Sequence, residues 1–167
     1  MAFKEVLVKD LRENPFTVLS DEWMLVSAGN ESGFNMMTAS WGYFGHMWNK
    51  NTAVTVLRPQ RYTKEFVDKN DCFALSFYGG DKKIHGVCGS VSGRDTDKAA
   101  STGLIPVFSD GTVYFEQARL VFICKKIYAQ RFDPACFIDS SIDGEFYPEK
   151  DYHIAYAGEI IKAYEKI

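Results

Sequence analysis

Asn35-Met36-Met37-Thr38-Ala39-Ser40-Trp41-Gly42 places an amide, two hydroxyls and an indole in a segment that otherwise is typical of a β-strand. In an extended chain, the odd-numbered residues of this segment share one face and the even-numbered residues share the other. One interpretation is a half-exposed strand whose polar groups meet water or a neighbour. The other is a binding surface on which a flat heterocycle stacks beside the indole. The segment by itself leaves both interpretations open.

A second polar signature follows about one strand later, at Arg58-Pro59-Gln60-Arg61-Tyr62-Thr63. Pro59 fixes the backbone direction, and Thr63 is the predicted N-cap of a short helix over residues 64–69. Guanidinium groups, a hydroxyl and a helix N-terminus together suit a phosphate monoester. The alternative is a solvated loop in which the arginines pair with surface acids such as Glu65 or Asp68.

A third patch, residues 89–98, combines glycines and serines with Arg94 and Lys98. Small residues permit a ligand to approach the backbone closely, and the two cations add positive charge. The same pattern also describes the start of a helix that is capped by Asp95 and needs no ligand.

Other site chemistries lack a signature in this sequence. The three histidines lie far apart and without the spacing of a metal site. No serine or cysteine nucleophile stands in a recognisable local motif, and no carboxylate can be assigned to orient a histidine. A metal centre and hydrolase chemistry are therefore not expected.

The hydrophobic pattern predicts a mainly β protein. Strands are expected at residues 22–29, 34–41, 52–57, 72–77, 118–128 and 153–164, and short helices at residues 64–69, 81–87 and 95–101. The last strand is ambiguous by periodicity, and Gly158 with the nearby aromatic residues favours a strand over a helix. Residues 139–151 are expected to form a polar surface loop. Regular strand–helix alternation and a G-x-G-x-x-G motif are missing, so we expect one domain over residues 1–167, a mostly antiparallel barrel with helical insertions.

The composition excludes several classes of protein. Hydrophobic residues make up 46% and charged residues 25% of the 167 residues, as in globular proteins, and aromatic residues reach 15%, which suits strands, aromatic pockets or a subunit interface. The net charge is −3 and the sequence has no basic run, so no basic surface is expected that would bind nucleic acid or an anionic membrane. Neither a signal segment nor a membrane span is expected. The four widely spaced cysteines are expected to be reduced core thiols, and the expected location is the cytoplasm.

Four segments, taken in order, resemble the flavin reductase-like family, the FMN-binding split barrels that include flavoredoxin. The segments are residues 35–41, 58–63 and 92–98, and His153 with Gly158-Glu159-Ile160. The resemblance covers most of the chain, from about Asn14 to Ile161. It implies an FMN-binding split β-barrel of antiparallel, Greek-key-like strands. It also implies a homodimer with one FMN per subunit near the subunit interface.

The resemblance further implies which residues bind the cofactor. They are Asn35, Thr38, Ala39, Ser40, Trp41, Arg58, Arg61, Thr63, Lys98 and His153. Asn35 and Trp41 would contact the flavin, and residues 38–40 would bond to the ring edge or the ribityl chain. Arg58, Arg61 and Thr63 would hold the 5′-phosphate, with Lys98 as a further cation. His153 would lie near the isoalloxazine or the site of the reductant.

The function implied by the resemblance is that of an oxidoreductase that transfers a hydride from NAD(P)H to FMN. The flavin supplies the reactivity in this chemistry, so no general base is required of the protein. A second hypothesis is a flavoredoxin-like electron carrier with tightly bound FMN and a protein redox partner. A third is a non-enzymatic barrel that binds another small ligand. The sequence leaves open the choice between NADH and NADPH.

Overall fold

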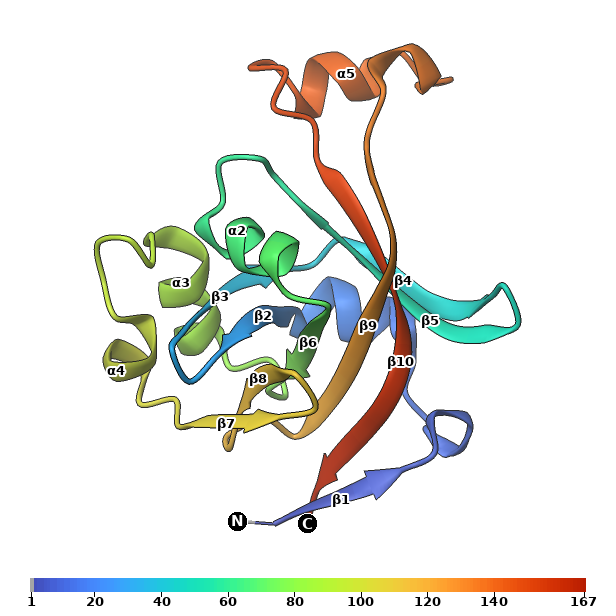
Figure 1. Cartoon of the computed structure of the whole chain (residues 1–167). Helices are drawn as coiled ribbons and strands as arrows, with labels where there is room; N and C mark the ends of the chain where they lie inside the picture. The colour runs from blue at the N-terminus through green and yellow to red at the C-terminus, as the bar shows by residue number, and fades with distance from the viewer. Residues whose placement is uncertain (1) are drawn as a thin grey trace.

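The computed structural model describes residues 2–167, in which antiparallel strands predominate and short helices connect them (Figure 1). The strands are β1 (Phe3–Val6), β2 (Met24–Asn30), β3 (Gly33–Ala39), β4 (Gly42–Met47), β5 (Lys50–Leu57), β6 (Cys72–Phe77), β7 (Pro106–Ser109), β8 (Thr112–Phe115), β9 (Leu120–Arg131) and β10 (Ile154–Lys166). The helices are α1 (Pro15–Thr17), α2 (Tyr62–Lys69), α3 (Lys82–Ser90), α4 (Lys98–Thr102) and α5 (Ser141–Phe146), with the shorter turns η1 (Val8–Asp10), η2 (Val18–Glu22) and η3 (Pro134–Cys136).

The main sheet runs in the order β3-β2-β6-β9-β10-β5-β4, and β1 pairs with the far end of β10. Every pairing is antiparallel, and β7 and β8 form a separate hairpin. The two edge strands of the main sheet, β3 and β4, follow each other in the chain and are joined by Ser40 and Trp41. The barrel is therefore split between its two sequence-adjacent edges, which confirms the predicted split antiparallel barrel.

Alternation along the strands builds two hydrophobic layers. Met24 and Val26 of β2 and Met37 of β3 lie in the barrel interior, whereas Leu25 and Met36 lie in a second cluster outside it. The second cluster includes residues of α3, α4 and the β7–β8 hairpin, which cover the outer face of this part of the sheet. Because successive strand residues point to opposite faces, β3 contributes to both layers.

Gly42 makes the change of direction from β3 into β4 possible. A Cβ at this position would overlap the carbonyl oxygen of Val54, so the chain can approach β5 this closely only at a glycine. β4 then pairs with β5 from Lys50 as far as Thr55. The next residues of β5, Val56 and Leu57, pair with β10 on one side and extend past β4 on the other. The split opens at this end of β5.

Residues 132–152, which we call the arm, leave the barrel between β9 and β10 and carry η3 and α5 (Figure 1, top). The expectation of a polar surface loop at residues 139–151 is partly wrong: most of these residues are exposed, but Ser141–Phe146 forms α5 and Tyr147 is buried. Tyr147 and Tyr152 are buried within the arm, and Phe137 stacks on Tyr147 at a centroid distance of 5.8 Å. The sequence pattern missed this because the aromatic residues are separated by polar ones and pack only after the segment folds on itself.

Most of the expected strands are confirmed, and several further elements appear. The sequence did not predict β1, β4, β7 or β8, which are short or only half-buried. The expectation that Thr63 caps α2 is wrong. The helix begins at Tyr62 after Arg61, and Thr63 lies inside it with its hydroxyl engaged by Asn35. The expected cap Asp95 is likewise replaced by Asp97, which caps α4.

Three of the four cysteines are buried, and Cys136 in the arm is exposed. All four are free thiols. Within residues 2–167, no helix has the length and apolar character needed to span a membrane. The same residues contain no group of three or more His, Cys, Asp or Glu side chains placed to hold a metal ion.

Candidate functional site

A groove lies at the split of the barrel and consists of two cavities that share Met37, Arg58 and Arg61. One cavity, of about 180 Å³, is the aromatic end, and Trp41 and His153 contribute to its lining. The other, of about 320 Å³, is the cationic end. The cationic end is lined by the start of α2, the loop of residues 90–93 and Lys98. Most of the residues that the sequence analysis selected therefore meet in one continuous groove.

Lys98 is the least exposed cation at this groove. Its side chain is 4% exposed, and its ammonium donates to the carbonyl oxygens of Met36 at 2.7 Å and Cys88 at 3.2 Å. Burial lowers the pKa of the Lys98 ammonium, which the neighbouring Cys88 thiol opposes and Arg61 reinforces. A buried charge is costly unless it is compensated, and two carbonyl dipoles compensate only part of it.

Arg61 faces the same cavity from the start of α2 and donates to the carbonyl oxygen of Gly89 at 2.9 Å. Among the ion pairs formed within residues 2–167, none involves Arg61 or Lys98. The first N–H groups of α2 have no acceptor within the helix, and the helix dipole adds positive potential at this end. The cationic end therefore has the donors and the charge to bind an anion.

Thr63 lines the cationic end, and Asn35 supports it from outside the cavity. Both are buried, and the side-chain amide of Asn35 donates to the Thr63 hydroxyl at 2.9 Å, which ties β3 to α2. Gly93 packs against the same amide so closely that a Cβ would overlap Asn35 Oδ1. Sequence reasoning expected Asn35 to share a face with Trp41 toward the flavin. In the structure, Asn35 lines neither cavity of the groove and instead contacts Thr63 and Gly93, which line the cationic end.

Two rings, Trp41 and His153, line the aromatic end, and a third ring, Phe146, packs against Trp41. The Trp41 side chain is 43% exposed, and its ring centroid lies 5.1 Å from His153 and 5.4 Å from Phe146 of the arm. His153 is 8% exposed, and its Nδ1 lies 2.8 Å from the Tyr147 hydroxyl. Burial, with Arg58 as the next cause, lowers the pKa of His153 to about 4. The imidazole is therefore neutral at neutral pH, and Trp41 offers an exposed face for a flat ring.

Residues 38–40 line the aromatic end from the edge of the sheet. β3 pairs with β2 on one side only, so part of its main-chain N–H and C=O groups face the groove. The Thr38 hydroxyl donates to the carbonyl oxygen of His85 at 2.9 Å and lies 3.2 Å from His85 Nδ1. Thr38 is thus tied to α3, whereas Ala39 and Ser40 offer the groove mainly backbone groups.

Arg58 differs from the other predicted phosphate ligands because its donors are already engaged. Its Nη1 lies 2.5 Å from Asp151 Oδ2, and its Nη2 donates to the Phe146 carbonyl at 2.9 Å. The guanidinium carbon also lies 5.3 Å from the centroid of the Tyr147 ring. Arg58 lines both cavities, but its charge is paired within the arm.

Sequence reasoning missed two apolar residues of the groove, Met37 and Val56, and the neighbouring Phe146, which contacts Trp41. Met37 and Val56 are apolar strand residues and carried no signal that separates a pocket wall from the core. Phe146 lies in a segment expected to be a polar loop. The loop of residues 90–93 could have been given more weight, because its serines and glycine lie between two cationic signatures.

A larger depression of about 900 Å³ lies at the turns between β2 and β3 and between β7 and β8. It is open, and its lining mixes lysines with acids, including Asp110, whose carboxylate pairs with Lys162 at 2.7 Å. None of the predicted site residues lies in it. The smaller groove at the split, where unpaired cations and an exposed indole converge, is the better candidate.

Comparison with solved structures finds the same fold in a flavoredoxin and in FMN-binding proteins. Flavoredoxin from Methanosarcina acetivorans is 20% identical, with a TM-score of 0.69 over 98% of this chain and 75% of that chain. An FMN-binding protein from Thermus thermophilus, with bound 1-cyclohex-2-enone, is 20% identical, with a TM-score of 0.67 over 97% and 77% of the two chains. The FMN-binding domain of a flavin reductases-like enzyme from Shewanella baltica OS155 is 18% identical, with a TM-score of 0.69 over 98% and 77%.

No family model and no curated protein sequence matches the chain. At these identities the structural similarity establishes the fold, and the chain folds as a flavin reductase-like split barrel, as its sequence predicts.

Proposed function

We propose that the protein is an FMN-binding oxidoreductase of the flavin reductase type that accepts a hydride from NAD(P)H. The observation that carries the proposal is the pairing of two chemically different ends in one groove. At one end lie the buried Lys98 and the half-buried Arg61, neither of which forms an ion pair within residues 2–167. At the other end lies the exposed indole of Trp41. A ligand with a phosphate at one end and a flat ring system at the other matches this arrangement.

The residues fit FMN by the chemistry of their donors. Arg61, Lys98 and the first N–H groups of α2 would hold the phosphate, since each offers hydrogens and positive charge to an anion. Trp41 would pack against the isoalloxazine, and the free edge of β3 would bond to polar atoms of the ring or the ribityl chain. The chemistry supplied by bound FMN is hydride uptake from a reduced nicotinamide and onward electron transfer.

The protein's own task in this proposal is to bind and orient the cofactor. His153 is neutral and held by Tyr147, so it offers a hydrogen-bonding edge without a charge beside the ring. If the Tyr147 hydroxyl donates to Nδ1, the imidazole carries its hydrogen on Nε2 and can donate it. Phe146 packs edge-on against Trp41, with ring centroids 5.4 Å apart, and so helps to fix the position of the indole.

A flavoredoxin-like electron carrier is the second candidate, because a flavoredoxin is among the proteins that share this fold. In that case FMN stays bound and the electrons come from a protein donor. Oxidation of NADH or NADPH with added FMN separates the candidates. Turnover with either nucleotide supports the reductase, whereas reduction only by a redox protein supports the carrier.

We further propose a homodimer located in the cytoplasm. The β4–β5 hairpin and β9 expose three aromatic side chains, Tyr43, Trp48 and Tyr128, at 60%, 56% and 46%. Aromatic residues gathered in this way are typical of subunit interfaces. Four free cysteines suit a reducing compartment.

The first experiment is the visible absorption spectrum of the purified protein, followed by titration with FMN if it is colourless. Flavin bands that co-purify support a tightly held cofactor. A colourless protein that binds added FMN supports flavin as a released substrate. A protein that binds no flavin contradicts both flavin functions and leaves a barrel that binds another small ligand.

A further inference from the structure

Arg58 connects two parts of the molecule that are far apart in sequence. It lies just after β5, and its guanidinium bonds to Asp151 and to the Phe146 carbonyl, both in the arm. Gln60 donates to the same Asp151 oxygen at 2.7 Å, so one carboxylate receives two donors from the segment after β5. The ring of Tyr147 lies 5.3 Å from the guanidinium carbon.

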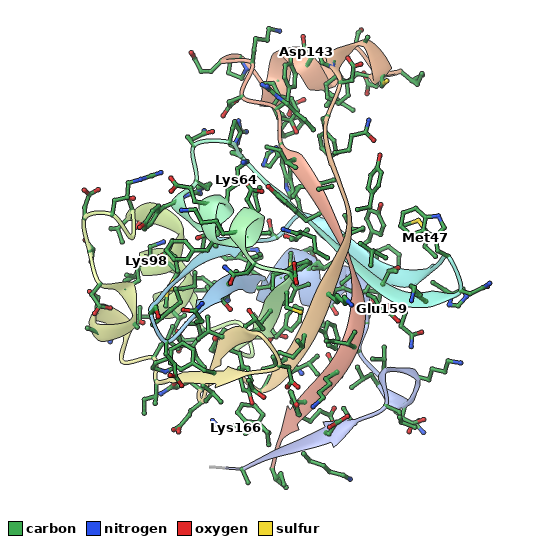
Figure 2. All side chains as sticks on the ribbon, in the orientation of Figure 1. Met47, Lys64, Lys98, Asp143, Glu159 and Lys166 are labelled. Atoms are coloured by element: carbon green, nitrogen blue, oxygen red, sulfur yellow. The ribbon has the colours of Figure 1, made fainter. Side chains whose placement is uncertain are left out.

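The arm has few other attachments to the barrel. Its internal bonds join Asp143 to Lys150 and Tyr152, and Arg131 at the end of β9 donates to the Lys150 carbonyl. Among the side-chain hydrogen bonds of residues 2–167, those that reach the arm from beyond the neighbouring strands β9 and β10 come from Arg58 and Gln60. Figures 1 and 2 show the consequence: Asp143 and α5 stand at one extreme of the molecule, away from the body of the barrel.

The arm contacts two side chains that line the aromatic end of the groove, Trp41 and His153. The arm contributes Phe146, whose ring meets Trp41, and Tyr147, whose hydroxyl holds His153. Both contacts lie within a few residues of the bonds that Arg58 makes. A displacement of the arm would therefore change both the cover over Trp41 and the orientation of His153.

Charge pairing separates Arg58 from the cations at the other end of the groove. Its positive charge is neutralised by Asp151 at 2.5 Å, whereas Arg61 and Lys98 bond only to carbonyl oxygens. A phosphate that recruited Arg58 would have to compete with this carboxylate and release the arm. A paired guanidinium therefore adds little to phosphate binding and much to the position of the arm.

We propose that Arg58 is a positioning residue that fastens the arm over the aromatic end of the groove, and that it does not bind the ligand phosphate. The fastening is a property of the protein without ligand. Its consequence for flavin selectivity rests on the proposed function.

The fastening is tested by hydrogen exchange of residues 132–152 in Arg58→Met, in Arg58→Lys and in the unaltered protein. Arg94→Met is the matched control, since Arg94 also forms an ion pair, with Glu65, and lies 4.5 Å from the Tyr62 ring. Loss of two charge-assisted bonds predicts exchange in the arm that is about tenfold faster or more in Arg58→Met. Arg58→Lys keeps the charge but loses the planar set of donors, so its exchange rate in the arm is expected to lie between those of Arg58→Met and the unaltered protein. Unchanged exchange in the arm of Arg58→Met overturns the proposal.

Asp151→Asn is the second variant, in case Arg58→Met fails to fold. It removes the opposing charge and keeps the size of the side chain, so it also predicts faster exchange in the arm. Trypsin cleavage after Lys150, whose side chain is 60% exposed, gives an independent rate for the same segment. Neither readout requires flavin, so a protein that binds no flavin contradicts the proposed function and leaves this test intact.

Selectivity is tested by the ratio of affinities for FMN and riboflavin, which differ in the phosphate. Arg61→Met is expected to lower this ratio about tenfold or more, because it removes a donor to the phosphate. Arg58→Met is expected to leave the ratio unchanged, even if both affinities fall together. A ratio that falls as far in Arg58→Met as in Arg61→Met overturns the proposal and makes Arg58 a phosphate ligand.

Discussion

The side-chain amide of Asn35 on β3 donates a hydrogen bond of 2.9 Å to the hydroxyl of Thr63 on α2, and both side chains are buried. This bond joins the edge of the split sheet to the helix whose N-terminus forms the cationic end of the groove. It explains why a threonine stands inside the first turn of α2, where its hydroxyl is not used as a cap.

Thr63→Val, which keeps the shape and removes the hydroxyl, is expected to lower the free energy of unfolding by about 1–3 kcal/mol, since it leaves the Asn35 amide buried without its acceptor. Combined with Asn35→Ala in a double-mutant cycle, the two changes should be less costly together than their sum. Denaturant unfolding measures the loss of stability in each single variant and in the double variant. The exposed Thr17→Val is the control, expected within about 0.5 kcal/mol of the unaltered protein. Additive losses would mean that the two side chains act independently.

Gly93→Ala is expected to destabilise the protein by about 1–3 kcal/mol, because the new methyl group would overlap Asn35 and force the loop or the amide to move. Gly86→Ala in α3 is the matched control. Its Cβ would meet no atom within 4 Å, so a gain of about 0.5–1 kcal/mol from helix propensity is expected. Thermal unfolding of the two variants and of the unaltered protein measures both changes in stability. Equal effects of the two substitutions would contradict the close packing of Gly93 on Asn35.

Lys98→Met is expected to weaken FMN binding by about tenfold or more and to leave riboflavin binding nearly unchanged, since the buried ammonium would act only on the phosphate. Lys69→Met, which removes an exposed cation from the opposite end of α2, serves as the control. Fluorescence titration with the two flavins gives both affinities. An equal loss for riboflavin would mean that Lys98 supports the groove without contacting the phosphate.

Stability is expected to fall with acidification between about pH 6.5 and pH 4. Burial, followed by Lys82 for His85 and Arg58 for His153, lowers the pKa of both histidines to about 4, whereas an unfolded histidine titrates near 6.5. Between pH 6.5 and pH 4 the two histidines are protonated in the unfolded chain but remain neutral in the folded protein. The stability present above pH 6.5 is therefore lost as the pH falls toward 4.

Each of these histidines contributes a slope of at most about 1.4 kcal/mol per pH unit in that window. His85→Gln and His153→Gln should each remove one such contribution from the pH dependence of the free energy of unfolding, measured with denaturant. His46→Gln removes an exposed histidine for comparison. Slopes that do not change in the two buried-site variants would contradict neutral histidines at these positions.

Trp48→Ser is expected to weaken self-association at least tenfold, because Trp48 and Tyr128, with ring centroids 5.9 Å apart, form the exposed aromatic patch proposed as the interface. Sedimentation velocity over a range of concentrations measures the effect. Phe16→Ser, which removes a ring that is 82% exposed on α1, is the control. A monomeric unaltered protein would remove the proposed dimer altogether.

The sequence was sufficient for elements whose pattern is local. β6 matches its predicted residues, Cys72–Phe77, because a short, mostly apolar run is bounded by turn residues such as Asp71 and Gly79. β10 was predicted as a strand in spite of an ambiguous period, since Gly158 and the nearby aromatic residues favour a strand over a helix. Arg61 and Lys98 were selected by their charge, by the motifs around them and by the family resemblance, and the fold brings both to the cationic end.

The remaining features depend on contacts between distant segments. The role of Arg58 is set by Asp151, 93 residues later, and no local pattern links the two. Asn35 could not be assigned to Thr63 rather than to a ligand, because an amide on a strand has the same sequence signature in both cases. The arm was missed for a similar reason, since its buried tyrosines are surrounded by polar residues.

Within residues 2–167, the sheet does not close between its edge strands β3 and β4, and beyond Thr55, where β4 no longer pairs with β5, the opening lies between β3 and the end of β5. In these residues β3 and β5 are not hydrogen-bonded neighbours, and the groove lies where Met37–Ala39 faces Val56 across the opening. A molecule that contacts both sides of the opening links them. Because it binds only the folded protein, its binding free energy adds to the thermal stability of the barrel. The melting temperature therefore reports how fully a ligand occupies the groove. It can rank ligands by affinity without an assay of any reaction.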